Sequence, residues 1–217
     1  MSDTVVVFAG GPAPSALTAA SLPLDAQVVA ADSGAGHALA LGLRVDVAVG
    51  DFDSIAPAAL AELERASARI ERHPAAKDAT DLELALGAAM ALEPARIVVV
   101  GGAGGRLDHM LAELLLLGAE RYAGPELDAL LGPATIHVVR RERELAGTVG
   151  ELISLLALHG PAVGVTTHGL AYPLRGETLS PGSTRGVSNV FVHAEARISV
   201  ERGVLLALRA GQTEAHT

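Results

Sequence analysis

Residues 45–54 read Val-Asp-Val-Ala-Val-Gly-Asp-Phe-Asp-Ser, an apolar run followed at once by a glycine and two aspartates. The segment Val45–Val49 is typical of a short buried strand. A helix is expected soon after it, over Pro57–Ser67, because Pro57 suits a first helical turn and Ser54 is a possible cap. A strand, a polar turn and a helix in this order form the unit from which parallel sheets are built.

The same alternation extends through the first two-thirds of the chain. Beyond the segment above, we expect strands at Thr4–Phe8, Gln27–Ala31 and Ile97–Val100, and helices at Gly34–Leu41, Asp78–Ala91 and Leu107–Tyr122. The Ile97–Val100 run is apolar throughout, as in a strand that is covered on both faces. This rhythm predicts an α/β fold with a doubly wound, mostly parallel sheet.

The pattern changes after Gly132-Pro133. Short strand-like segments separated by glycine and proline follow, and no amphipathic helix stands out among them. These segments are Thr135–Arg140, Arg143–Leu145, Glu151–Leu158, Ala162–Thr167, Asn189–His193, Arg197–Val200 and Val204–Leu208. We therefore predict an α/β domain over residues 1–132 and a small all-β sandwich domain over residues 133–217.

Composition excludes several classes of protein. The chain has 217 residues, half of them hydrophobic, yet no apolar run approaches the roughly 20 residues that span a bilayer, and no signal peptide is apparent. The absence of cysteine excludes disulfides, thiolate nucleophiles and zinc ribbons. A net charge of −9 and only five aromatic residues argue against a nucleic-acid surface. We expect a soluble cytoplasmic protein without a membrane or nucleic-acid partner.

Aspartates recur where strands of the predicted parallel sheet end, which is where such sheets bind ligands. They are Asp32, Asp51, Asp53, Asp78, Asp81 and Asp108. Asp51 and Asp53 can face the same ion while Phe52 turns into the core, since alternate residues of an extended segment point to one side. Converging carboxylates repel unless a cation neutralises them, and aspartate oxygens suit Mg²⁺ held together with substrate phosphates. For any one of these residues alone, helix capping or turn formation remains the alternative.

A glycine-rich turn, Gly101-Gly102-Ala103-Gly104-Gly105-Arg106, lies between a predicted strand and a predicted helix. Glycines let backbone N–H groups approach an anion, and Arg106 adds a guanidinium. The turn is not a P-loop, because no Lys-Ser/Thr pair follows it, and an ordinary connection is the alternative. Two further residues are notable because Lys77 is the only lysine and Asn189 the only asparagine in the chain.

Five short motifs together resemble those of the thiamine pyrophosphokinase (thiamine diphosphokinase) family, in the same order and at similar spacing. They are ADSGA (31–35), GDFDSI (50–55), KDATD (77–81), GGRLDH (104–109) and GVSN (186–189). The resemblance implies an N-terminal α/β domain, a C-terminal β-sandwich and a homodimer. It also implies transfer of the diphosphate group of ATP to the thiamine hydroxyl with Mg²⁺, giving thiamine diphosphate and AMP.

The resemblance also assigns residues. It implies that Asp51, Asp53 and Asp81 bind the metal, and that these three and Asp108 serve catalysis. It implies that ATP is bound by Asp32, Lys77, Thr80, Gly102, Gly105, Arg106 and His109. Ser188 and Asn189 are expected to bind thiamine, since their hydroxyl and amide match the donors and acceptors of an aminopyrimidine.

The chain departs from the family pattern mainly on the acceptor side. Val190 stands where an acid is usual, and without tryptophan any aromatic contact to thiamine must come from Tyr172, Phe191 or another residue. Two alternatives therefore stay open. One is a Mg²⁺-dependent diphosphokinase with another hydroxyalkyl acceptor, such as a hydroxymethylpterin. The other is a non-catalytic regulator that binds nucleotide or thiamine.

Overall fold

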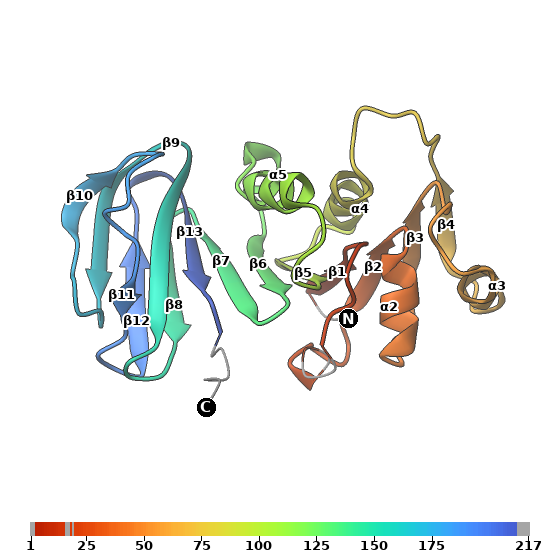
Figure 1. Cartoon of the computed structure of the whole chain (residues 1–217), viewed down its shortest axis with the longest axis horizontal. Coiled ribbons are helices and arrows are strands. Elements are labelled where there is room, and N and C mark those ends of the chain that lie inside the picture. Colours follow the sequence, from red (N-terminus) through yellow and green to blue (C-terminus); the bar gives the residue numbers. More distant parts are fainter. Residues whose placement is uncertain (1–2, 16–17, 19, 212–217) are drawn as a thin grey trace. The chain divides into compact units, whose positions relative to one another are not determined.

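The computed structural model describes residues 3–15, 18 and 20–211 of the chain. These residues form two compact units, shown in Figure 1. The first contains the described residues up to Glu113 together with Gly124–Gly132. The second contains Leu114–Ala123 and the described residues from Pro133 onward. Within the described part of the chain, no helix is both long and apolar enough to cross a membrane.

The first unit is built on a parallel sheet with strand order β4-β3-β2-β1-β5-β6. The strands are β1 (Thr4–Phe8), β2 (Gln27–Ala31), β3 (Val47–Gly50), β4 (Arg69–Arg72), β5 (Arg96–Gly101) and β6 (Glu126–Leu131). In β1, β2, β3 and β5 nearly every residue is buried, because helices cover both faces of the sheet. The chain order reverses between β1 and β5, a feature of sheets that bind ligands beyond their carboxyl ends.

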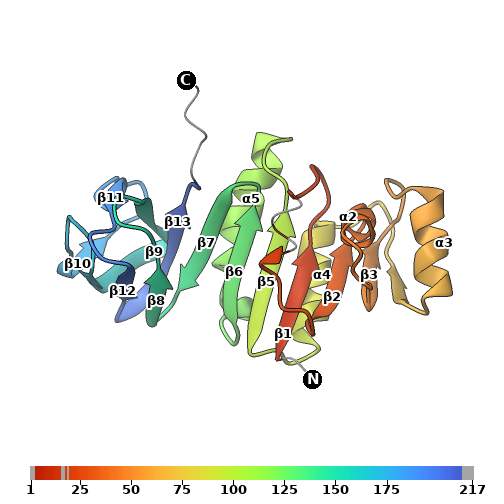
Figure 2. The same ribbon diagram turned by 90° about the horizontal axis from the view of Figure 1, so that it is seen from below.

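Helices lie on both faces of this sheet (Figures 1 and 2). Those of the first unit are α2 (Gly34–Ala40), α3 (Pro57–Arg65) and α4 (Asp81–Met90), and α5 (Leu107–Leu117) begins in this unit. Helices α2 and α3 cover one face and α4 covers the other, which confirms the doubly wound sheet. Gly34 allows α2 to start close to the sheet, because a Cβ atom there would lie 2.4 Å from the carbonyl oxygen of Phe8.

The second unit is antiparallel. Its strands are β7 (Ala134–Val139), β8 (Glu142–Ala146), β9 (Leu152–His168), β10 (Arg175–Leu179), β11 (Asn189–Val190), β12 (Glu195–Ser199) and β13 (Arg202–Arg209). The 17-residue strand β9 pairs with β13, β11, β12 and β10, so it joins two groups of strands. Buried side chains such as Leu155, Phe191 and Ile198 form one core among them. The second unit thus confirms the predicted small all-β fold.

Several predicted elements were wrong in extent or missing. The segments predicted as separate strands at Glu151–Leu158 and Ala162–Thr167 form the single strand β9, and the strand predicted at Asn189–His193 is reduced to β11. The helix predicted over Asp78–Ala91 begins only at Asp81, because Thr80 caps it through its side-chain oxygen. The helix predicted over Leu107–Tyr122 ends at Leu117, and the 3₁₀ helix η1 (Glu120–Tyr122) follows it.

Strands β4, β6 and β10 were not predicted, because each contains charged residues that hide the apolar pattern of a strand. In β6, Asp128 is only 2% exposed and accepts hydrogen bonds from Arg96, at 3.0 and 2.6 Å, on the neighbouring strand β5. This pairing makes a buried aspartate compatible with a parallel strand. Strand β4, at the edge of the sheet, has no buried residue.

Candidate active site

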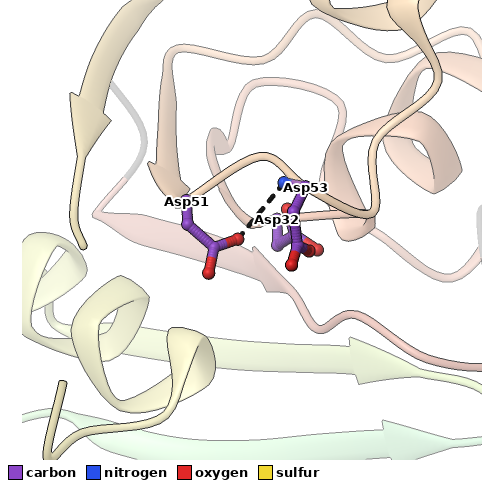
Figure 3. A group of neighbouring side chains, drawn as sticks. All are labelled: Asp32, Asp51 and Asp53. Atoms are coloured by element: carbon purple, nitrogen blue, oxygen red, sulfur yellow. Dashed lines mark hydrogen bonds between the residues drawn. The ribbon is translucent and has the colours of Figure 1, made fainter. Parts of the chain in front are cut away.

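Three aspartate side chains of the first unit meet beyond the ends of two neighbouring strands. Asp32 follows β2, and Asp51 and Asp53 follow β3. One carboxylate oxygen from each lies within 4.8 Å of the other two, and the three groups converge in Figure 3. Because β2 and β3 are parallel neighbours, residues far apart in the sequence reach the same edge of the sheet.

The backbone after each strand is bent to bring the carboxylates together. Asp32 has a φ of 43° and Phe52 a φ of 62°, both in the left-handed region that non-glycine residues seldom adopt. Phe52 is 8% exposed and packs in the core, so Asp51 and Asp53 point away from the core, as the sequence predicted. The N–H of Asp53 donates to Asp51 Oδ1 at 3.2 Å, and Ser54 Oγ donates to Asp53 Oδ1 at 2.7 Å.

Asp32 is the most buried member of this aspartate cluster, with 8% of its surface exposed. Its Oδ1 atom is buried without a hydrogen-bond partner. Burial raises the pKa of Asp32, and the charges of Asp81, Asp51 and Asp53 raise it further, against a hydrogen bond from the backbone of Ser33. A buried carboxylate oxygen that lacks a partner and is surrounded by like charges fits a bound cation. The donor set, all carboxylate oxygen, suits Mg²⁺.

Lys77 connects this cluster to the start of helix α4. Its ammonium donates to Asp81 Oδ1 at 2.6 Å and lies 3.8 Å from Asp51 Oδ2. The Lys77 side chain is only 14% exposed. Burial by itself would lower the pKa of Lys77, but the hydrogen bond and charge of Asp81 outweigh burial and raise it. The only lysine of the chain therefore lies as a cation among the aspartates.

Of the predicted metal ligands, Asp51 and Asp53 belong to the aspartate cluster, whereas Asp81 is hydrogen-bonded to Lys77. Asp32, which was expected only to contact ATP, supplies the third clustered carboxylate oxygen. The sequence contained a signal for this, because Asp32 follows a buried strand directly, as Asp51 does.

The glycine-rich turn after β5 packs against another loop of the same unit. The N–H of Gly102 donates to the carbonyl oxygen of Pro12 at 2.9 Å, and a Cβ atom on Gly102 would lie 2.4 Å from that oxygen. Gly105 has a φ of 81°, which favours glycine. Gly102 is therefore required for loop packing, and its N–H group is already used.

The residues after this turn are exposed. Arg106 donates to the two carboxylate oxygens of Asp108 at 3.2 and 2.6 Å. This pair lowers the pKa of Asp108 to about 2, mainly through the hydrogen bond from Arg106. His109, in the first turn of α5, is also exposed. Thr80, predicted to contact ATP, accepts a hydrogen bond from the N–H of Glu83 at 3.2 Å as the cap of α4.

The two predicted thiamine-binding residues lie in the second unit and differ in exposure. Ser188 is exposed, and its N–H donates to Ser154 Oγ at 3.1 Å. Asn189 is 3% exposed, and its side chain is hydrogen-bonded to the backbone of Tyr172. A ligand can therefore reach the Ser188 hydroxyl more readily than the Asn189 amide.

Comparisons with known families agree with this division. Residues 22–126 match the family model described as thiamin pyrophosphokinase, catalytic domain. Residues 134–205 match the model described as thiamin pyrophosphokinase, vitamin B1 binding domain. The aspartate cluster, Lys77 and the glycine-rich turn fall in the first region, and Tyr172, Ser188 and Asn189 fall in the second.

Individual relatives point the same way. Thiamine pyrophosphokinase of Bacillus subtilis is 28% identical over 193 residues, which cover 83% of this chain and 86% of that protein. The crystal structure of a Bacillus subtilis thiamine pyrophosphokinase matches with a TM-score of 0.84 at 28% identity, covering 97% of this chain and all of the other. That of the Geobacillus thermodenitrificans enzyme matches with a TM-score of 0.81 at 26% identity, covering 97% and 99% of the two chains.

Proposed function

This chain belongs to the thiamine pyrophosphokinase family, and we propose that it transfers the diphosphate group of ATP to the hydroxyl of thiamine. The products are thiamine diphosphate and AMP. The observation that carries this proposal is the aspartate cluster, in which Asp32, Asp51 and Asp53 bring carboxylate oxygens within 4.8 Å of one another. A non-catalytic regulator would have no need of this concentration of negative charge.

The cluster fits a divalent cation. Asp32, Asp51 and Asp53 would hold Mg²⁺, and Asp81, hydrogen-bonded to Lys77, adds negative charge beside them. When bound, Mg²⁺ would offset the negative charge of the ATP phosphates and of the group in transfer. The partnerless Oδ1 of Asp32 supports this assignment, because a buried carboxylate oxygen is otherwise costly to leave without a partner.

The chain's own groups would bind and orient the phosphates. Lys77 is a buried cation among the aspartates, so it can offset phosphate charge without reorganising. Arg106 and His109 are exposed near the start of α5, and we assign them to ATP together with Gly105 and Thr80. Gly102 would act by holding its loop against Pro12, since its N–H group is used there.

Two aspartates outside the cluster complete the proposed catalytic set. Asp81 keeps Lys77 in place, and Asp108 keeps the guanidinium of Arg106 oriented. Positioning and electrostatics of this kind supply most of the acceleration in phosphoryl transfer. In the second unit, the exposed Ser188 would contact thiamine through its hydroxyl.

We also propose a homodimer and a cytoplasmic location. Leu107, Leu111 and Leu115 are 72%, 56% and 40% exposed, and their four-residue spacing puts them on one side of α5. Such an exposed apolar stripe favours burial against a second copy. Replacing Leu111 with Glu should shift the protein from dimer to monomer in sedimentation velocity. A cytoplasmic location suits a reaction that consumes ATP.

The test of the proposed reaction is product analysis. The protein is incubated with ATP, Mg²⁺ and thiamine, and we expect AMP and thiamine diphosphate in equal amounts by chromatography and mass spectrometry. ADP with thiamine monophosphate would contradict the proposal, as would transfer to a hydroxymethylpterin but not to thiamine. Asp51→Asn should abolish product formation, whereas Asp25→Asn, an exposed aspartate of the same unit, should not.

A further inference from the structure

We infer that Tyr172 is the aromatic surface that receives the rings of thiamine, and that Asn189 is a positioning residue that fixes Tyr172 in place. This inference rests on the proposed function, since it concerns how the same acceptor is recognised. It is carried by the burial of the chain's aromatic residues and by the hydrogen bonds of one buried amide.

Tyr172 differs from the other aromatic residues in exposure. The chain has five aromatic residues, all within the described part of the structure. Phe8, Phe52, Tyr122 and Phe191 are at most 8% exposed, whereas Tyr172 is 60% exposed. Phe191, the other aromatic candidate in the region matched by the vitamin B1 binding model, is fully buried in the core of the second unit. Tyr172 is therefore the aromatic residue whose ring a ligand can reach.

The backbone of Tyr172 is held at both of its polar groups by one side chain. Asn189 Oδ1 accepts from the N–H of Tyr172 at 2.9 Å, and Asn189 Nδ2 donates to the carbonyl oxygen of Tyr172 at 2.7 Å. The amide thus replaces a neighbouring peptide group. Asn189 Oδ1 also accepts from the N–H of Val190 at 2.9 Å, and the N–H of Ala171 donates to the carbonyl oxygen of Val190 at 2.8 Å.

Only an amide side chain can make this pair of bonds at that length. An aspartate would present two acceptors, one of them to the carbonyl oxygen of Tyr172, and alanine would leave both backbone groups without partners. Asn189 is the only asparagine of the chain and 3% exposed, so it is dedicated to holding Tyr172. An exposed ring held by a buried amide is prearranged for a ligand, because little freedom remains to be lost on binding.

The surroundings of Asn189 suit a ligand that is both aromatic and polar. Ser188, the preceding residue, is exposed and has a φ of 57°, and its N–H donates to Ser154 Oγ at 3.1 Å. Val187 and Val192, close to Asn189 in the chain, are 41% and 42% exposed. Thiamine carries a positively charged thiazolium ring and an aminopyrimidine ring. An electron-rich phenol ring attracts such a cation and also stacks on a flat heterocycle.

Steady-state kinetics separate this role from a structural one. Tyr172→Leu should raise the KM for thiamine about 5- to 30-fold, the range of one cation–π contact, and leave the KM for ATP unchanged. Tyr172→Phe keeps the ring and should stay within about twofold of the wild type. Val149→Ala, at an exposed apolar residue of the same unit, is the matched control and should have no effect. An unchanged thiamine KM in a folded Tyr172→Leu variant would overturn the inference.

A double variant tests the positioning role of Asn189. Asn189→Ala should raise the thiamine KM, and adding it to Tyr172→Leu should cause no further increase, because both changes remove the same contact. Fully multiplicative effects of the two substitutions would overturn the positioning role.

Fluorine NMR tests the contact directly and needs no altered fold. Labelling with 3-fluorotyrosine gives two signals, from the buried Tyr122 and the exposed Tyr172, and Tyr172→Phe identifies the second. Adding thiamine should shift the Tyr172 signal and not the Tyr122 signal. If thiamine is converted to thiamine diphosphate and the Tyr172 signal does not move, this inference fails and the proposed function stands. If thiamine is neither bound nor converted, both fail.

Discussion

Replacing Asp32 with Asn should make the metal-free protein more stable and remove most of the stabilisation that Mg²⁺ provides. Asp32 faces Asp51 and Asp53, with carboxylate oxygens within 4.8 Å. At an effective dielectric constant of about 20, two unit charges at that distance repel by about 3 kcal/mol. Exposure of Asp53 and the nearby cation Lys77 reduce this repulsion, so we expect a net gain of about 1 to 3 kcal/mol in the free energy of unfolding.

The assay is thermal unfolding followed by the helical circular dichroism signal, which comes mainly from the first unit. For a chain of this size each kcal/mol corresponds to about 2 to 4 °C in Tm. In EDTA, Asp32→Asn should therefore melt above the wild type. Mg²⁺ at about 100 times its Kd would stabilise the wild type by about 2.7 kcal/mol, and this increment should largely disappear in Asp32→Asn. Asp25→Asn is the control and should behave like the wild type in both conditions.

The pH dependence has a definite sign. The pKa of Asp32 is raised in the folded protein above its ordinary value of 3.8, chiefly by burial. The folded state therefore holds the proton more tightly than the unfolded state, and stability is lost as the pH rises through the folded pKa. Asn cannot ionise, so the advantage of Asp32→Asn should be small near pH 4 and grow above it. Destabilisation by Asp32→Asn in EDTA, with the Mg²⁺ increment intact, would refute this account of the aspartate cluster.

Three further predictions concern other residues. Asp51→Asn or Asp53→Asn should lower turnover by about 100-fold or more with an unchanged circular dichroism spectrum, and near-normal activity in both would reject their assignment. Lys77→Met should raise the KM for ATP at least about tenfold, because a charge-assisted contact is lost, and an unchanged KM in assays that vary ATP would exclude that contact. Burial would raise the pKa of Glu151, but the hydrogen bonds from Arg209 and the backbone of Thr148 outweigh it and lower the pKa below 4.5. Glu151→Gln should therefore cost about 1 to 3 kcal/mol at pH 7, and the difference in urea unfolding from the wild type should vanish as the pH falls through the folded pKa; a difference that persists at pH 2 would contradict this.

Much of the first unit could be predicted from the sequence, because its central strands are continuous apolar runs between glycine-rich turns. Strands β1 and β2 have the predicted bounds, Thr4–Phe8 and Gln27–Ala31. Strand β6 could not be predicted in the same way, since its Asp128 becomes compatible with burial only through Arg96, 32 residues away in the sequence. That pairing is a tertiary contact, and no local pattern contains it.

The aspartate cluster was only partly predictable, for a similar reason. The two-residue spacing of Asp51 and Asp53 indicates that both carboxylates face one ion, and the structure brings them together. Which third carboxylate joins them depends on how neighbouring strands align and on the positive φ of Asp32. The pairing of Lys77 with Asp81 depends on side-chain reach from a loop to the first turn of α4. The dedication of Asn189 to Tyr172, 17 residues away, likewise exists only in the folded second unit.

The most direct measurement is anomalous diffraction from crystals soaked with Mn²⁺, as a substitute for Mg²⁺, and a non-hydrolysable ATP analogue. We expect one strong manganese peak within about 2.2 Å of carboxylate oxygens from Asp32, Asp51 and Asp53. A manganese peak elsewhere, or nucleotide bound with these three side chains unchanged and no metal among them, would contradict the claim that this cluster binds the catalytic cation.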